Sequence, residues 1–129
     1  WHSVEGYSKV GSYLGNSSTN GFFNYCGFRP AWVMIKKING VNDWYVYDNI
    51  RSQFGGTSDI GYNANGTIIK PNSTVVEATE TYFQIDMLSN GFKLRTTDAG
   101  DNGSGTDYLY TAWAEAPLVN SEGVPTNAR

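Results

Sequence analysis

Alternation of apolar and polar side chains on both sides of a Ser-Asn-Gly turn is the feature that most constrains this chain. Residues 82–88 alternate, Ser89-Asn90-Gly91 interrupts them, and residues 92–96 alternate again. Asn and Gly tolerate the positive φ values of the turns that match strand twist, so the sequence predicts a β-hairpin around Asn90-Gly91. The side chains predicted to share a face are Phe83, Ile85 and Met87 in its first strand, and Phe92 and Leu94 in its second.

Similar period-two runs recur along the chain, separated by clusters of Gly, Asn, Ser and Asp. The most apolar run, residues 31–38, is rich in β-branched and aromatic side chains, and Pro30 suits the entry to a strand. Residues 43–48 follow after a short loop and are expected to be its antiparallel partner. Further strands are predicted at residues 7–15, 22–25 and 108–115.

These runs predict an all-β domain, a β-sandwich or jelly-roll-like fold of about eight to nine short antiparallel strands with little or no helix. Aromatic residues make up 15% of the chain and fifteen residues are glycine, a mixture typical of short strands joined by tight turns.

The two ends of the chain differ from this pattern. Residues 1–4 repeat the character of residues 113–116, so we expect residues 1–3 to be the end of a preceding domain or a linker. Residues 4–119 would form the sandwich module. Residues 120–129 have no periodicity and are expected to be an extended tail.

Composition disfavours several classes of site. The single cysteine, Cys26, cannot form an internal disulfide or a zinc site with paired thiolates, and we predict a buried, inert thiol. Nine Lys and Arg stand against twelve Asp and Glu, and the only adjacent basic pair is Lys36-Lys37, so a nucleic-acid partner is not expected. No segment resembles a membrane span.

We expect no catalytic residues. The sole histidine, His2, lies at the edge of the domain, where a Ser-His or Cys-His pair is improbable. The nearest candidates for a glycosidase pair are Glu77, Glu80 and Asp86, but residues three apart in an extended chain point to opposite faces. The interpretation favoured for these carboxylates is solvated turn and edge charge.

Two polar, Gly-rich segments, residues 52–66 and 97–106, are predicted to be surface loops. Within residues 98–107, Asp98, Asp101 and Asp107 are the only candidate ligands for Ca²⁺, although the spacing of an EF-hand is absent. The alternative is a plain flexible turn, and no cofactor is otherwise expected.

Aromatic side chains beside amides would suit a sugar, because rings stack on sugar faces while amides hydrogen-bond to hydroxyl groups. The candidate ligand-binding residues are Tyr62, Asn63, Asn65, Tyr45 and Tyr47. Nothing around Tyr62 is apolar, so it is the least suited to a core. Trp32, Trp44 and Trp113 are expected to be core or interface residues.

Four segments in order, residues 27–36, 44–51, 88–94 and 108–117, resemble a module of tailed-phage virion proteins. That module recurs in tail, tail-fibre and receptor-binding polypeptides, often in tandem with lectin-like domains. The resemblance spans nearly the whole chain. It implies a place in the virion, at the phage tail or the capsid surface, but it brings no catalytic residues.

We therefore expect a non-enzymatic structural module of a phage tail or tail fibre that presents a binding surface to the host or to neighbouring subunits. Expected partners are other virion subunits, with a homo-oligomer favoured, and a host-surface glycan. One alternative is a capsid decoration or head-fibre protein. Another is a carbohydrate-binding or depolymerase-associated domain.

Overall fold

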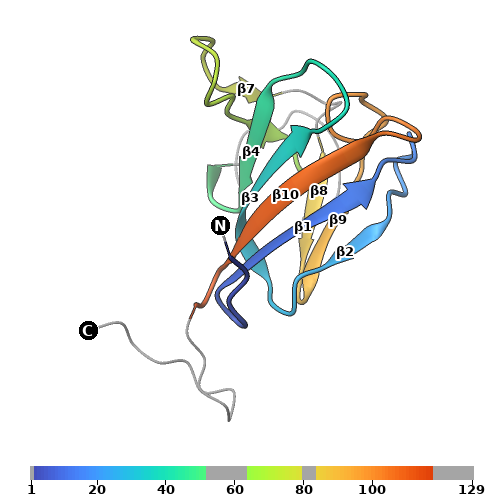
Figure 1. Cartoon of the computed structure of the whole chain (residues 1–129). Helices are drawn as coiled ribbons and strands as arrows, with labels where there is room; N and C mark the ends of the chain where they lie inside the picture. The colour runs from blue at the N-terminus through green and yellow to red at the C-terminus, as the bar shows by residue number, and fades with distance from the viewer. Residues whose placement is uncertain (1, 52–63, 80–83, 118–129) are drawn as a thin grey trace.

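The computed structural model describes residues 2–51, 64–79 and 84–117, and it confirms the all-β, sandwich-like fold (Figure 1). The front sheet has the order β1 (Ser8–Leu14), β10 (Asp107–Ala114), β3 (Pro30–Lys37) and β4 (Trp44–Asp48). The back sheet has the order β2 (Phe23–Tyr25), β9 (Gly91–Leu94), β8 (Ile85–Leu88) and β5 (Ala64–Asn65). A third, two-stranded sheet pairs β6 (Thr67–Ile68) with β7 (Ala78–Thr79). No helix in these ranges is long and apolar enough to cross a membrane.

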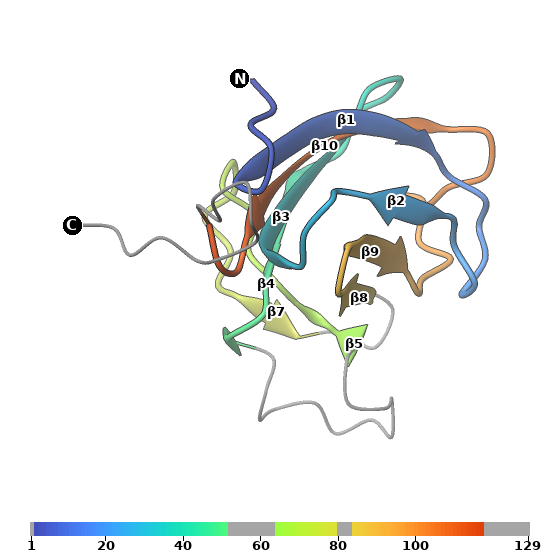
Figure 2. The same cartoon turned by 90° about the horizontal axis from the view of Figure 1, so that it is seen from below.

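The front sheet curves over the back sheet, and the core lies between them (Figure 2). Period-two alternation selects the inward side chains, such as Val33 and Ile35 of β3, which are fully buried. Aromatic rings fill much of the space: Tyr13 stacks on Tyr108 at 5.1 Å between centroids. Cys26 is a free, buried thiol as predicted, and burial raises its pKa to about 12.

The outer face of the front sheet carries the three tryptophans that the structure describes, Trp32, Trp44 and Trp113. Trp32 and Trp113 are register partners on β3 and β10, and their rings meet edge to face at 4.6 Å. Trp44 lies on the same face of β4, opposite Lys36. All three tryptophans are half-buried, and none belongs to the core between the sheets.

The predicted hairpin is present as β8 and β9, but its turn differs. Leu88 pairs with Gly91, so Ser89 and Asn90 form the connection and Gly91 begins β9. Neither Asn90 nor Gly91 has a positive φ, so that part of the prediction was wrong. Gly91 is needed for another reason: a Cβ there would lie 2.1 Å from the carbonyl oxygen of Asn24 on β2.

One side of the sandwich is closed by residues 64–69. They pair with β8 through β5 and then reach β4, where Val46 and Ile69 exchange backbone hydrogen bonds of 2.9 and 3.1 Å. On the opposite side, β1 and β2 are the neighbouring edge strands of the two sheets (Figure 2). Backbone pairing among the described strands therefore joins the two sheets at one side, through residues 64–69, and not between β1 and β2.

The core can be tested with two phenylalanines. Phe92 is fully buried and contacts Tyr110 edge to face at 5.0 Å, whereas Phe22 is 59% exposed. We expect Phe92→Ala to lower the free energy of unfolding by about 3–5 kcal/mol, and Phe22→Ala to change it by about 0.5 kcal/mol or less. Urea denaturation measures both. Equal losses in the two variants would contradict the placement of the core.

Candidate functional site

The sugar-binding residues predicted from the sequence are not gathered into one site. Tyr62 and Asn63 lie outside the described residues, and Asn65 is placed only through its backbone, in β5 opposite Ile85. Tyr45 and Tyr47 are 4% and 0% exposed. Both rings point into the core from the inner face of β4, so the expectation that they form an exposed stacking platform is corrected.

Tyr47 and Tyr13 have a structural task instead. The Tyr47 hydroxyl donates to Oδ2 of Asp101 at 2.5 Å, and the Tyr13 hydroxyl donates to the backbone carbonyl of Asp101 at 2.5 Å. Tyr13 comes from β1 and Tyr47 from β4, the two outermost strands of the front sheet. Asp101 therefore ties both edges of that sheet to the segment between β9 and β10.

That segment was predicted to be a flexible surface loop, and part of it is buried. Asp101 and Asn102 are 0% and 2% exposed. The Asn102 amide nitrogen donates to the carbonyl of Thr96 at 2.7 Å and to that of Ser18 at 3.0 Å, and its oxygen accepts the N–H of Asn16 at 3.1 Å. These polar residues can be buried because most of their polar groups are hydrogen-bonded. Most of the partners, such as Asn16 and Ser18, are far away in the sequence.

The candidate calcium ligands are not arranged around one point. Asp98 accepts the N–H of Gly100 at 2.6 Å, Asp101 accepts the Tyr47 hydroxyl, and Asp107 is exposed at the start of β10. Across the described ranges, no group of three or more His, Cys, Asp or Glu side chains could hold a metal ion.

Asp101 is the most perturbed acid described. Burial raises its pKa to about 8; the hydrogen bond from Tyr47 opposes this shift, and the nearby charge of Asp98 adds to it. Its Oδ1 atom is buried without a hydrogen-bond partner among the described residues. The neutral carboxyl is therefore the form that the fold favours around neutral pH.

The carboxylates considered for glycoside hydrolysis are held in ion pairs. Oε2 of Glu77 lies 3.0 Å from Nη1 of Arg51, and Oδ2 of Asp86 lies 2.5 Å from Nε of Arg95. Glu80 lies outside the described residues. Glu77 is exposed, as expected of a solvated turn charge. Asp86 is 8% exposed and lies on β8, an inner strand of the back sheet, so the expectation of a solvated edge charge was wrong for this residue.

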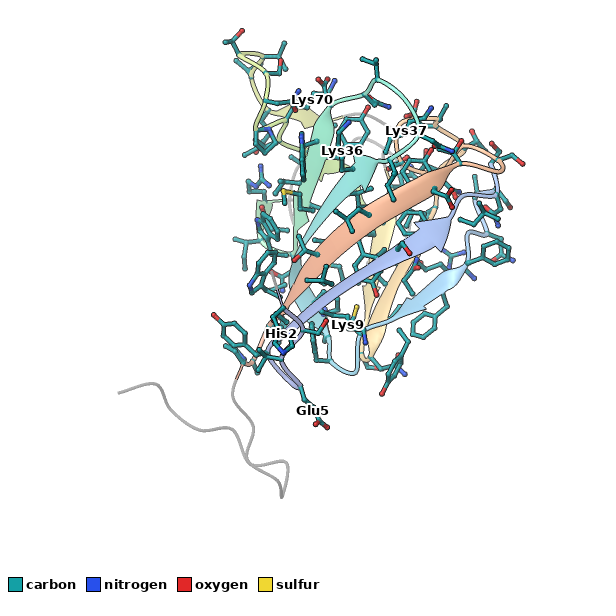
Figure 3. All side chains as sticks on the ribbon, viewed as in Figure 1. His2, Glu5, Lys9, Lys36, Lys37 and Lys70 are labelled. Atoms are coloured by element: carbon teal, nitrogen blue, oxygen red, sulfur yellow. The ribbon has the colours of Figure 1, made fainter. Side chains whose placement is uncertain are left out.

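The side chains labelled in Figure 3 lie toward the two ends of the front sheet. Lys36, Lys37 and Lys70 gather at one end, where Lys36 donates to the carbonyl of Asn42 at 2.7 Å and Lys70 lies 3.1 Å from Asp43. His2 lies at the opposite end. The three lysines form one cluster at one end, not a stripe that could follow a phosphate backbone.

The strongest surface feature is an aromatic patch called the β2 patch below, made of Phe22, the residue just before β2, and of Phe23 and Tyr25 on this strand. These side chains are 59%, 44% and 62% exposed. Phe23 and Tyr25 share the outer face of the back sheet, because Asn24 between them points inward and is buried. Exposed aromatics concentrated on one edge strand are typical of an interaction surface.

The neighbours of the patch across the back sheet lie on β9. Tyr25 pairs with Gly91 and Phe23 with Lys93 across β9. A Cβ on Gly91 would lie 2.9 Å from Cζ of Phe23, so that ring lies over the bare backbone of Gly91. The patch therefore presents exposed rings beside one cationic side chain, Lys93.

Sequence reasoning assigned no role to this strand, although a signal was available. Phe22 and Phe23 are adjacent, so in an extended strand their side chains start toward opposite faces. A strand of a two-layer sandwich buries only one face, so at least one of the two rings had to be exposed.

Comparison with known proteins gives one match. The family described as "Domain of unknown function (DUF7483)" matches residues 1–117. No curated protein and no solved structure matches the chain.

The buried carboxyl makes stability depend on pH. The pKa of Asp101 is raised from its ordinary 3.8 to about 8, so its contribution to folding is complete below pH 3.8 and is lost as the pH rises through about 8. We expect the free energy of unfolding to fall across this range by an amount on the order of a few kcal/mol. Asp43 and Asp48 have pKa values lowered from the ordinary 3.8, so their protonation changes the free energy of unfolding below this pH range and not within it.

Asp101→Asn removes the titrating group while keeping an acceptor for Tyr47, so its stability should stay nearly constant across the same range. Urea denaturation at a series of pH values measures both proteins. A slope that survives in the variant would show that another group causes it.

Proposed function

The chain belongs to the DUF7483 family, a domain of unknown function, and we propose that it is a structural module of a tailed-phage virion protein that makes contacts through the β2 patch. The observation that carries the contact role is the exposure of Phe23 and Tyr25 on the edge strand β2 and of Phe22 just before it. The virion setting is supported by the resemblance of four ordered segments to tail and tail-fibre modules. The surface that it presents faces either the host or a neighbouring subunit.

The size of the patch sets the strength of such a contact. Fully covering one large apolar side chain contributes about 1.5–3 kcal/mol. The three rings are roughly half exposed, so covering each gains on the order of 1 kcal/mol, and association itself has an entropic cost. A single copy would bind weakly. Repeated copies on one particle raise the effective concentration and make weak contacts sufficient.

A host-surface glycan is the second candidate partner, and one observation favours it. Phe23 and Tyr25 lie on the same face as Lys93, the register partner of Phe23. Two exposed rings can stack on sugar faces, and the cation beside them can attract an acidic sugar. A subunit contact and a glycan contact use the same side chains, so the same variants test both.

An electron cryomicroscopy map of the particle of the phage whose genome encodes this chain tests the proposed function. We expect density for the domain on the tail or a tail fibre, with the β2 patch either against a neighbouring subunit or facing outward at the tip. Placement on the capsid shell would establish the decoration role in its place. A particle that lacks the chain would overturn the virion proposal.

A double variant, Phe23→Ser with Tyr25→Ser, tests the patch itself. These rings are exposed, so the fold should persist while subunit incorporation or attachment to host cells falls by about tenfold or more. The matched control is Val41→Ser, because Val41 is fully exposed in the loop between β3 and β4. Equal loss in the control, or no loss in the double variant, would remove the patch from the function.

A further inference from the structure

We propose that Asn39 and Gly40 form a self-modifying site, at which the backbone nitrogen of Gly40 attacks the Asn39 side chain and converts it to aspartate and isoaspartate. The pair lies in the loop between β3 and β4 of the front sheet. It is therefore separate from the β2 patch and from the contact function proposed for that patch. The reaction needs no partner except water.

The chemistry is an intramolecular exchange of one amide for another. The Gly40 nitrogen gives up its proton and bonds to Cγ of Asn39, and the side-chain nitrogen leaves Cγ as ammonia, which takes up that proton. The product is a five-membered cyclic imide. Water then opens the ring at Cγ, which gives aspartate, or at the backbone carbonyl carbon, which gives isoaspartate. Both products carry one more negative charge than asparagine.

A glycine after the asparagine removes the main steric obstacle to this attack, because no Cβ hinders the approach of its nitrogen to Cγ. The chain contains five such Asn-Gly pairs, which begin at residues 20, 39, 65, 90 and 102. The sequence alone makes these pairs equivalent. The fold must therefore decide which of them reacts.

Hydrogen bonds protect two of the other pairs. The N–H of Gly21 donates to the carbonyl of Leu94 at 3.1 Å, and the N–H of Gly103 donates to the Tyr108 hydroxyl at 2.8 Å. The side-chain amide of Asn102 is held as well, with its shortest hydrogen bond at 2.7 Å. Both glycines are buried. Each nitrogen must lose a hydrogen bond and reach water before it can react.

The pair of Asn90 and Gly91 is held by the back sheet. The carbonyl of Asn90, which belongs to the peptide bond that would react, accepts the N–H groups of Cys26 at 2.9 Å and Gly27 at 3.1 Å. Gly91 is buried as the first residue of β9. This peptide plane cannot turn toward the Asn90 side chain without breaking both hydrogen bonds. Asn65 is placed only through its backbone, so the comparison rests on the other four pairs.

The pair of Asn39 and Gly40 has none of these restraints. Both residues are exposed, and among the described residues no hydrogen bond involves residues 39–41. The loop is fixed on either side of them: the N–H of Ile38 donates at 2.9 Å to the first residue of β10, and the carbonyl of Asn42 accepts the ammonium of a β3 lysine at 2.7 Å. The free residues between these points can rotate until the Gly40 nitrogen faces Cγ.

A cation lies beside the reacting backbone. A Cβ added to Gly40 would lie 3.0 Å from Cε and 3.5 Å from Nζ of Lys37, and the same ammonium donates to the carbonyl of Ala99 at 3.5 Å. The attack develops negative charge on the Gly40 nitrogen and then on the oxygen of the tetrahedral intermediate. A positive charge close to these atoms favours both charged species. Lys37 therefore assists the reaction without exchanging atoms.

The products suit this place in the fold. The new carboxylate lies at the end of the front sheet where Lys36, Lys37 and Lys70 gather (Figure 3), and it adds one negative charge to a formal net charge of -3. Isoaspartate lengthens the backbone by one atom, in a loop that has no hydrogen bond to lose among the described residues. The domain therefore stays folded, and its lysine cluster becomes less positive as the protein ages.

Peptide mapping by mass spectrometry, which separates asparagine, aspartate and isoaspartate, tests the site in the folded chain during incubation at mildly alkaline pH. We expect Asn39 to convert about tenfold or more faster than Asn20, Asn90 and Asn102. In guanidinium chloride the protection is lost, so the four sites should react at similar rates. Equal rates in the folded chain, or the same preference for Asn39 in the unfolded chain, would overturn the proposal.

Gly40→Ala provides the variant arm. The φ of Gly40 is not positive, and the added Cβ would contact only the flexible end of Lys37, so the variant should fold. We expect its Asn39 to convert about tenfold or more slowly, because the Cβ hinders the nitrogen. An unchanged rate would overturn the imide route.

The lysine has its own test. Lys37→Gln should slow the conversion of Asn39 by about two- to fivefold, whereas Lys37→Arg keeps the charge and should keep the rate. The rates at Asn20, Asn90 and Asn102 in the same molecules are the internal control and should not change. Equal rates in the glutamine and arginine variants would remove Lys37 from the reaction.

Discussion

The hydrogen bonds to Asp101 are the interaction on which the rest of the structure depends. Tyr13 reaches it from one edge strand of the front sheet and Tyr47 from the other, so one residue between β9 and β10 links the two margins of a curved sheet. The same hydrogen bonds hold the segment that connects β9 of the back sheet to β10 of the front sheet. Because the carboxyl is buried with one oxygen unpartnered among the described residues, its burial has a desolvation cost, which the hydrogen bond from Tyr47 to the other oxygen partly offsets.

The sequence was sufficient to predict the strands, because period-two alternation is a local property. The pairing of residues 31–38 with 43–48 and the hairpin after Ile85 are both present. It was not sufficient to predict which polar residues are buried. Asp101 accepts hydrogen bonds from Tyr47, which is 54 positions earlier in the sequence, and from Tyr13, which is 88 positions earlier. No local pattern indicates partners at such separations. The role of Gly91 was missed for the same reason, since the atom it makes room for belongs to Asn24.

The candidate site shows the same limit in another form. Both faces of β4 carry aromatic or aliphatic side chains, so alternation could separate Tyr45 and Tyr47 from Trp44 and Val46 but could not say which pair faces inward. On β2 the ambiguity was smaller, because two adjacent phenylalanines cannot both be inside. The exposed rings at and beside β2 are the feature on which the proposed contact function rests.

The place of β10 in the front sheet has a consequence for synthesis. This strand is the last one described along the chain, yet it lies between β1 and β3 and pairs with both. On the ribosome, β1, β3 and β4 emerge before the strand that must join β1 to β3. The nascent domain therefore cannot complete its larger sheet until nearly all of it has left the exit tunnel, and a message truncated before residue 107 encodes a chain without the centre of that sheet.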